Sequence, residues 1–572
     1  MKYVPGGGSI GAKLMLLGEA PSYAEVEAGK PFVGPSGKEL DRLLKDSNIS
    51  RSDTWISNVF KYEIQPNIKG KKIPSWIRAR NAGINVEESL KELQEEINSI
   101  KPNCILALGG TALWALTGIK PKSKKKSEDD EGNIKYRAGS LSNFRGSILT
   151  GMGTKVVPTY HPAHLLYTDA SEIKGYWNRF VMVFDFKRAN AQSKFPELKL
   201  PQRTLQICRS SFELAEFRAR YKDKIKLSVD IEAGGHCIPI CIGLAFNPQH
   251  GMTVPLWNRD NISSIPDSDL VQIWLILAEI LYEKEIIGQN FNYDRDKIRR
   301  LGFSIRKHIS DTMLKAFAIN PELPKSLAFN TSIYTEEPFY KDEGMYEGRI
   351  SDLLIGCARD ACVTYEVDEN MEPDLVELNQ VEFYNNFLMK LPELYLSIEN
   401  QGFGIDEVAR ERLLKKYIAM DEQNRYELFK LTGTEINVNS PKQIYSLLFD
   451  NLKLPPRKGT GEEELTSLLN LQSFTNKEHR KIVELILEGR RMRKAISTYL
   501  MALPDYDGRM RTTYFPCLET GRTSTGQQDP PIRSMVEVID ENGKKKQKVL
   551  GMAFQTISKH GEYSDVREIF IP

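Results

Sequence analysis

The sequence predicts a multidomain α/β protein whose last third is mainly helical. A chain of 572 residues exceeds what one hydrophobic core accommodates, and a prior of about 150 residues per domain suggests roughly three or four domains. Short apolar runs that lead into small or polar residues recur in residues 13–190 and 203–368, as strands of α/β units do. Over 376–400 and 406–431, apolar residues recur at helical spacing instead.

The composition is that of a soluble globular protein, with 41% hydrophobic and 27% charged residues. No apolar run reaches the length of a membrane span, and the N-terminus lacks the apolar core of a signal peptide, so no membrane partner is expected. The net charge of +2 is too small to indicate a nucleic-acid binder by itself. The seven cysteines are scattered and odd in number, which predicts reduced thiols in a cytoplasmic compartment.

Residues 13–190 carry four strand-like runs and a helical segment in the order of an open α/β sheet. The runs cover residues 13–17, 54–59, 104–110 and 156–162, and the helical segment covers 39–45. Each run leads into a small or polar residue. Because such sheets bind ligands at the carboxyl ends of their strands, we expect a site at these ends.

Four short motifs near these strand ends resemble, in sequence order, those of the family 4 uracil-DNA glycosylases. The motifs are Gly18-Glu19-Ala20-Pro21, the segment 29–37 with the sequence GKPFVGPSG, Ser57-Asn58-Val59 and His161-Pro162-Ala163. The resemblance implies a glycosylase-like α/β/α sandwich over residues 1–190. It also implies a pocket that holds a base flipped out of the DNA stack.

The resemblance gives five residues a role in this pocket. Glu19 and Glu25 would belong to the loop that handles the water or the sugar. Phe32 would stack on the flipped base, Asn58 would read the uracil edge, and His161 would stabilise charge that develops on the base.

The cysteine content departs from that family. Its members usually bind an iron–sulfur cluster through four cysteines, whereas residues 1–190 contain only Cys104, and Tyr62 stands where a cysteine is usual. We therefore expect no iron–sulfur cluster. A glycosylase fold retained for DNA or protein contact, without base excision, is the alternative to an active enzyme.

A second α/β unit opens with two acids on one face of a strand, Leu227–Glu232. Strand side chains alternate between faces, so Asp230 and Glu232 should project to the same side. A divalent cation such as Mg²⁺ would offset their repulsion, whereas an edge strand with two solvated acids is the alternative. Later segments supply further acids, since Asp294 follows a short strand and turn and Asp360 lies on a helix.

These acids resemble the DEDD superfamily of 3′-to-5′ exonucleases, specifically the proofreading domain joined to family A DNA polymerases. The resemblance implies a ribonuclease H-like domain over residues 203–370 with two Mg²⁺ or Mn²⁺ ions roughly 4 Å apart. Its catalytic metal ligands would be Asp230, Glu232, Asp294 and Asp360. Such domains usually place a tyrosine four residues before the last aspartate to orient the attacking water, and here that position is Gly356. Metal binding should persist, whereas a positioned proton-handling group is worth about 10²- to 10⁴-fold in turnover.

Residues 376–572 resemble the thumb and the start of the palm of family A DNA polymerases, without the catalytic palm and fingers. Ser440 should cap a helix that begins at Pro441, and the basic stretch 530–550 is interpreted as a hairpin. The segment 519–525 resembles the one that touches template-primer DNA. In the family, the catalytic palm follows the segment that ends near Pro572, so this chain is not expected to polymerise DNA alone.

The combined expectation is the N-terminal part of a bacteriophage-type family A DNA polymerase that acts in DNA replication as a 3′-to-5′ exonuclease, in the host-cell cytoplasm. Its partners would be single-stranded and primer-template DNA, and a second chain that carries the palm and fingers. A uracil-excising repair enzyme and a non-catalytic DNA-binding subunit of a split polymerase are the alternatives. DNA contacts are expected from Asn290, Lys325, Thr520, Arg522 and Arg567.

Overall fold

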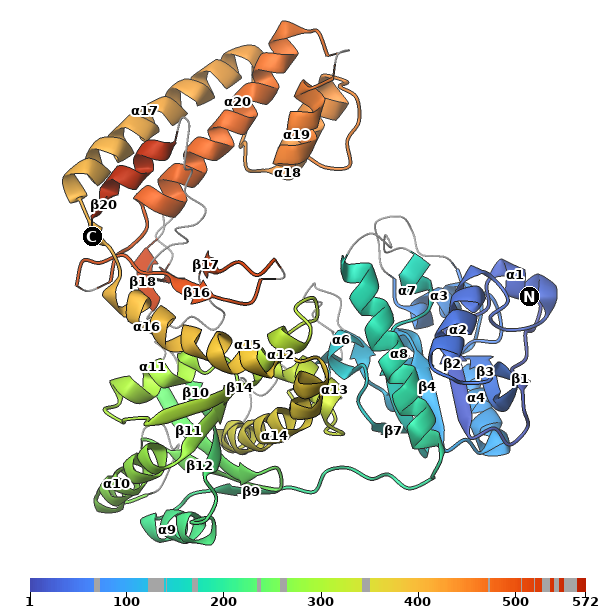
Figure 1. Ribbon diagram of the computed structural model, residues 1–572. Helices are drawn as coiled ribbons and strands as arrows, with labels where there is room; N and C mark the ends of the chain where they lie inside the picture. The colour runs from blue at the N-terminus through green and yellow to red at the C-terminus, as the bar shows by residue number, and fades with distance from the viewer. Residues whose placement is uncertain are drawn as a thin grey trace. The chain divides into compact units, whose positions relative to one another are not determined.

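The computed structural model organises the chain into two compact units (Figure 1). The first unit extends to Met389 and holds two six-stranded sheets, and the second begins at Lys390 and is mainly helical. The prediction of a multidomain α/β protein is confirmed, and the division into domains at 1–190, 203–370 and 376–572 stays a prediction. The structure describes residues 1–65, 73–121, 138–139, 141–166, 173–233, 238–257, 265–341, 350–471, 474–505, 507–518, 520–526, 535–539, 545–549 and 563–571.

The first sheet is parallel at its centre, with the strand order β1-β3-β2-β4-β8-β7. Its four central strands occupy the four runs predicted from the sequence. They are β2 (Leu14–Gly18), β3 (Thr54–Asn58), β4 (Cys104–Leu108) and β8 (Thr154–Thr159). The short edge strands β1 (Gly7–Gly8) and β7 (Leu149–Gly151) pair antiparallel to their neighbours.

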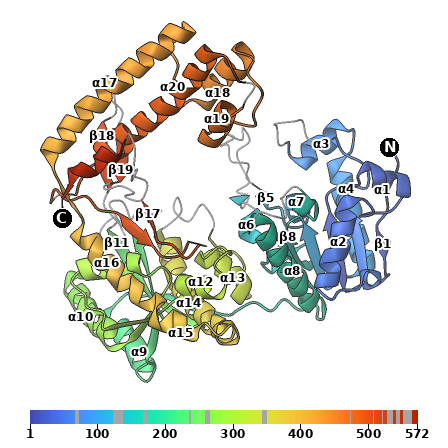
Figure 2. The same ribbon diagram turned by 45° about the horizontal axis from the view of Figure 1, so that its top comes forward.

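Helices cover both faces of this sheet (Figures 1 and 2). Successive residues of β2 contribute in turn to two hydrophobic clusters, one shared with α4 and α5 and the other shared with α2 and α8. The helices are α2 (Pro35–Asp46), α4 (Val86–Ile100), α5 (Gly110–Thr117) and α8 (Ile173–Ser193). Because the central strands are buried on both faces, their sequences are continuous apolar runs.

The second sheet is mixed, with the strand order β14-β13-β10-β11-β12-β9. Strand β10 lies at its centre, parallel to β13 and antiparallel to β11. The strands are β9 (Thr204–Ile207), β10 (Lys226–Ala233), β11 (Pro239–Asn247), β12 (His250–Pro255), β13 (Glu285–Gly288) and β14 (Lys307–Asp311).

Each face of the second sheet has its own helices. Helices α9 (Ser211–Arg220) and α10 (Asp267–Glu283) pack against one face of this sheet. Together with the strands they form a large hydrophobic cluster. Helix α14 (Ile350–Glu377) packs against the other face through small side chains, among them Cys357 and Ala361. Because these side chains are small, the backbone of α14 lies close to the strands.

The second unit is built on two long helices, α17 (Glu407–Thr432) and α20 (Lys477–Lys494), which lie side by side (Figures 1 and 2). The predicted helix over 406–431 is confirmed. The predicted cap at Ser440 is also confirmed, since its hydroxyl accepts the Gln443 N–H at 3.4 Å and α18 (Pro441–Tyr445) follows.

Two further predictions for this region are confirmed. The hairpin within 530–550 forms, because β18 (Met535–Ile539) and β19 (Lys545–Val549) pair antiparallel. The stretch 376–400 is helical but interrupted. It forms the end of α14, then α15 (Val381–Asn386) and α16 (Leu391–Gln401), and Asn379 adopts a φ of 55° in the first break.

Among the helices that the structure describes, none combines the length and the apolar character needed to cross a membrane. None of the six cysteines within the described residues forms a disulfide.

Candidate functional site

Three carboxylates converge at the face of the second sheet that α14 covers. Asp230 and Glu232 come from β10, and Asp360 comes from α14. One oxygen of each carboxylate lies within 4.8 Å of the other two. The structure therefore brings together three of the four predicted acids, from segments about 130 residues apart in the sequence.

The fourth predicted acid, Asp294, lies beside this group on α11 (Asn292–Arg300). Its carboxylate is buried and forms a hydrogen bond to the backbone of Ile231, the residue between the two acids of β10. Its negative charge contributes to raising the pKa of Asp230. Asp294 is thus a neighbour of the cluster rather than one of the three acids in mutual contact.

The electrostatics of the cluster favour a bound cation. Burial, followed by the charges of Asp360, Asp294 and Glu232, raises the pKa of Asp230 well above its ordinary value. Burial, followed by the charge of Asp360, raises the pKa of Glu232 to about 7. Carboxylate oxygens are the ligands that Mg²⁺ and Mn²⁺ prefer, so the residues present fit a divalent-metal site.

Two residues ahead of α14 also contact the cluster. The hydroxyl of Tyr340 donates a hydrogen bond to Asp360 Oδ1, and Lys341 Nζ lies 2.6 Å from Asp360 Oδ2. Burial opposes the charge of Lys341, yet Asp360 and Asp230 raise the pKa of its ammonium group. No local pattern in the sequence indicates that either residue contacts Asp360.

The predicted DNA contacts in the second sheet's domain have local structural partners. The Asn290 N–H, at a φ of 53°, donates to Asp311 at 3.0 Å. Asp311, which sequence reasoning did not single out as a site residue, also accepts the Phe291 N–H at 2.8 Å and caps α12 (Thr312–Ile319). The Lys325 ammonium donates to the carbonyl oxygens of Pro321 at 2.6 Å and Leu323 at 2.9 Å.

The predicted DNA contacts in the second unit lie at its surface. Thr520 and Arg522 are exposed just before β17 (Ser524–Gly526), and Arg567 is exposed on the turn before β20 (Phe570–Ile571). Their positions are compatible with contacts to a phosphate backbone.

Three of the residues predicted for the glycosylase-like pocket lie together where the strands of the first sheet end. A Cβ built on Gly18 would lie 2.4 Å from Asn58 Oδ1 and 2.6 Å from the Phe32 ring, so both side chains border the same space. The Phe32 ring also stacks on the His161 imidazole, with ring centroids 5.7 Å apart at 28°. The structure thus brings together three of the five residues predicted for this pocket.

The two glutamates predicted for this pocket are held by protein partners. The buried carboxylate of Glu25 accepts the N–H of Ser22 at 2.6 Å and that of Phe32 at 2.5 Å. This contact fixes Phe32 at a φ of 54°, so Glu25 acts on the pocket through Phe32. Glu19 forms an ion pair with Arg78.

The His161 imidazole accepts a hydrogen bond from the backbone in this arrangement. Burial lowers the pKa of its imidazole. Its Nδ1 accepts the Ala163 N–H at 3.2 Å, which leaves the ring proton on Nε2.

The residues of this domain do not fit an iron–sulfur cluster. Cys104, the one cysteine of residues 1–190, is fully buried in β4. Burial raises the pKa of its thiol to about 12, so it is not a poised thiolate ligand.

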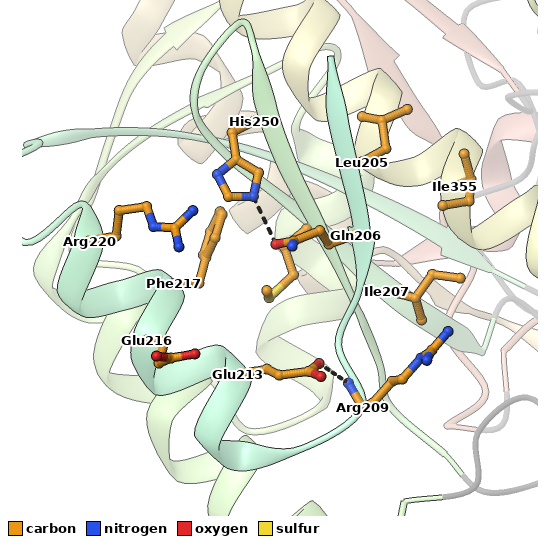
Figure 3. Close-up of a pocket in the computed structure, with 11 residues that line it drawn as sticks. Leu205, Gln206, Ile207, Arg209, Glu213, Glu216, Phe217, Arg220, His250 and Ile355 are labelled. Atoms are coloured by element: carbon orange, nitrogen blue, oxygen red, sulfur yellow. Dashed lines mark hydrogen bonds between the residues drawn. The ribbon is translucent and has the colours of Figure 1, made fainter.

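A separate cavity of about 520 Å³ lies between β9, α9 and β12 (Figure 3). His250 Nε2 and Gln206 Oε1 are 2.8 Å apart at its wall, and the Arg209 N–H donates to Glu213 at 2.8 Å. Its lining includes two arginines and two glutamates and none of the clustered acids. The balanced charge gives this cavity no clear preference for a ligand.

Comparisons with known proteins match both ends of the chain. Residues 5–181 match the Uracil DNA glycosylase superfamily, and residues 409–564 match DNA polymerase family A. The Type-4 uracil-DNA glycosylase of Pyrobaculum aerophilum is 32% identical over 181 residues, which cover 32% of this chain and 81% of that protein. These matches confirm the resemblances at the two ends, while the DEDD exonuclease resemblance stays a prediction.

The match to the polymerase relatives covers only part of their length. DNA polymerase I of Borreliella burgdorferi is 24% identical over 339 residues, which cover 57% of this chain and 36% of that protein. The chain therefore spans about a third of the length of this relative. A solved structure, the POL domain of Pol1 from M. smegmatis in complex with DNA primer-template and dNTP, aligns with a TM-score of 0.48 at 16% identity, over 64% of this chain and 58% of that one.

Proposed function

We propose that this chain, which belongs to the uracil DNA glycosylase superfamily through residues 5–181, is a DNA replication protein with a metal-dependent 3′-to-5′ exonuclease domain. Its residues 409–564 match DNA polymerase family A. The convergence of Asp230, Glu232 and Asp360 within 4.8 Å carries this proposal. A nuclease next to a polymerase segment would remove nucleotides from mismatched primer ends. The phage-type resemblance extends the proposal to a bacteriophage protein.

The proposed reaction is hydrolysis of the last phosphodiester bond. A water oxygen bonds to phosphorus while the bond from phosphorus to the 3′ oxygen of the preceding nucleotide breaks. One water proton goes to solvent and the leaving oxygen gains one, which yields a 3′-hydroxyl and a nucleoside 5′-monophosphate. Two divalent ions held by Asp230, Glu232, Asp294 and Asp360 would supply positive charge that activates the water and stabilises the leaving oxygen.

The chain's own residues prepare this site before any substrate arrives. Strand β10 fixes the spacing of Asp230 and Glu232, and α14 brings Asp360 against them. Lys341 adds one positive charge beside three acids, which limits their repulsion. A substrate phosphate would therefore meet a partly neutralised group of carboxylates.

Degradation of a 3′-labelled single-stranded oligonucleotide with Mg²⁺ or Mn²⁺ tests the proposal. Asp230→Ala should lower the rate by at least about 100-fold, because the clamped ions lose a ligand. Asp223→Ala, which changes an exposed acid of the same domain, is the matched control. If the wild-type protein at high concentration releases no 3′ nucleotides in a metal-dependent manner, the exonuclease proposal is wrong.

Uracil excision is the second candidate function, favoured by the grouping of Phe32, Asn58 and His161 at the strand ends of the first sheet. A neutral His161 with its proton on Nε2 is able to donate to an oxygen of a flipped base. The test is incubation with a uracil-containing oligonucleotide followed by alkali. Strand cleavage that disappears in His161→Leu would support excision, and an alkali-resistant product would count against it.

The second unit is proposed to bind primer-template DNA, and a second chain with the palm and fingers is a proposed partner. The match of residues 409–564 to DNA polymerase family A supports the primer-template part of this proposal. Mixing the chain with a palm-bearing partner and measuring primer extension tests it. Extension that needs both proteins supports the partner, and no gain over the partner alone contradicts it.

A further inference from the structure

Both oxygens of Asp360 are engaged by consecutive residues that lie outside its helix. Tyr340 donates its hydroxyl to Oδ1, and Lys341 places its ammonium 2.6 Å from Oδ2. Gly356, four residues before Asp360 on α14, has no side chain that could reach the carboxylate. The hydroxyl at this site therefore comes from a different segment of the chain.

The residue before this pair is held by the glycosylase-like domain. The Phe339 N–H donates to Ser147 Oγ at 3.0 Å. The Phe339 ring meets Phe144 edge to face, with centroids 5.1 Å apart at 71°, and packs against the hydrophobic cluster of the first sheet. Since neighbouring Cα atoms are about 3.8 Å apart, a fixed Phe339 strongly restricts where Tyr340 can lie.

Two arginines of the glycosylase-like domain fix the chain just upstream. Arg188 donates to the carbonyl oxygens of Ser332 and Thr335, at 2.8 Å each. Arg145, buried and paired with Asp185 at 2.5 Å, donates to Ser332 Oγ at 2.9 Å. Because buried arginines are costly to leave without partners, these hydrogen bonds hold the segment before Phe339 in place.

We infer that Tyr340 takes the place of the tyrosine missing at position 356, and that the glycosylase-like domain positions it through Ser147 and Phe144. The N-terminal domain is then a structural part of the exonuclease site, whether or not it excises uracil. Tyr340 is a positioning residue, which holds Asp360 in the orientation that the attacking water requires. The inference rests on the proposed exonuclease function.

Tyr340→Phe, which removes only the hydroxyl, tests the first half of the inference. It should lower kcat at least about tenfold, with KM within about twofold, because orientation of a reacting group affects the transition state more than binding. Mn²⁺ affinity, measured by calorimetry, should stay within about threefold because the carboxylates remain. Tyr334→Phe is the matched control, since Tyr334 donates to Asp374 of the same helix at 2.9 Å, away from the cluster.

Three outcomes separate this inference from the proposed function. A wild-type protein without metal-dependent exonuclease activity overturns both. Activity that is the same in Tyr340→Phe and wild type overturns the role of Tyr340 alone. Loss of Mn²⁺ binding together with activity in Tyr340→Phe also overturns it, because the tyrosine would then only maintain the metal site.

Ser147→Ala tests the second half, because it removes the acceptor of the Phe339 N–H from the other domain. The expected result is a severalfold lower kcat at unchanged Mn²⁺ affinity, with a small fall in melting temperature because the Phe339 N–H loses its acceptor. Ser89→Ala is the control, since Ser89 donates to the Asn85 carbonyl within α4. The double variant Phe144→Leu/Ser147→Ala should reduce kcat further, and wild-type kcat in this double variant would overturn the role of the glycosylase-like domain.

Discussion

Gly243 of β11 lies so close to Cys357 of α14 that a Cβ at this glycine would be 2.4 Å from the Cys357 carbonyl oxygen. Gly243 pairs with Asp230 across the sheet, and Cys357 lies three residues before Asp360. The same relationship recurs at Gly251, where a Cβ would lie 2.5 Å from the Ala358 carbonyl oxygen. The absence of side chains at these glycines is therefore what lets α14 bring Asp360 to the acids of β10.

Gly243→Ala should push α14 away from the sheet. We expect a loss of about 1–3 kcal/mol in unfolding free energy, the usual range for overpacking, and weaker Mn²⁺ binding because Asp360 moves away from Asp230. Urea denaturation and calorimetry measure the two effects. Gly7→Ala, at a glycine with no atom within 4 Å of the added Cβ, is the control, and wild-type Mn²⁺ affinity in Gly243→Ala would refute this account.

The raised pKa of Glu232 makes the stability of the metal-free protein depend on pH. The pKa is about 7 in the folded protein and 4.5 ordinarily, so between these values the folded state binds more protons than the unfolded state. Stability from this group is therefore present below pH 4.5 and is lost as the pH rises towards 7. Glu232→Gln removes the penalty and should raise the melting temperature in EDTA at pH 8.

The change in melting temperature of Glu232→Gln should depend on pH and on bound metal. For a domain of 150–250 residues, each kcal/mol corresponds to about 2–4 °C in melting temperature. The rise should be small at pH 4.5 and largest above pH 7, and added Mg²⁺ should stabilise the variant less than the wild type. Glu216→Gln, at an exposed acid of α9, should show neither change. Equal pH dependence in Glu232→Gln and wild type would contradict the assignment.

Local sequence patterns were sufficient to predict the central strands and the two acids on one face of β10. The four central strands of the first sheet are continuous apolar runs because helices cover both their faces. The pairing of Asp230 and Glu232 on one face follows from the two-residue period of a strand. Asp360 was found through its resemblance to a known helix motif.

Other features depend on contacts that no local pattern contains. Tyr340 reaches Asp360 from a segment without regular secondary structure, whose path is set by Phe339 against another domain. The helical run over 376–400 breaks where the Gln380 N–H donates to the Leu375 carbonyl and Asn379 turns to a positive φ. The apolar spacing continues across this break, so periodicity did not reveal it.

Gly18→Ala should close the glycosylase-like pocket, because the added Cβ would meet Asn58 Oδ1 at 2.4 Å and the Phe32 ring at 2.6 Å. We expect at least about tenfold weaker binding of a uracil-containing oligonucleotide in fluorescence anisotropy, since a displaced Asn58 leaves the base edge unpaired. Exonuclease activity should be unchanged.

The control for this change is Gly34→Ala, where the nearest atom to the added Cβ is 3.7 Å away. Both variants keep the same charge and gain the same methyl group. Uracil-specific binding that persists in Gly18→Ala would show that the space between Asn58 and Phe32 is not a base pocket.

Arg522→Ala tests whether the second unit contacts the DNA backbone. Each neutralised phosphate contributes about −0.9 to the slope of log K against log salt concentration for duplex DNA. If the exposed Arg522 contacts one phosphate, its removal should make this slope less negative by about 0.9 and weaken binding equally for different DNA sequences. Lys415→Ala is the matched control, because Lys415 is exposed on α17 and paired with Glu411 at 2.8 Å. A salt slope in Arg522→Ala equal to that of the wild type and of Lys415→Ala would remove Arg522 from the primer-template surface.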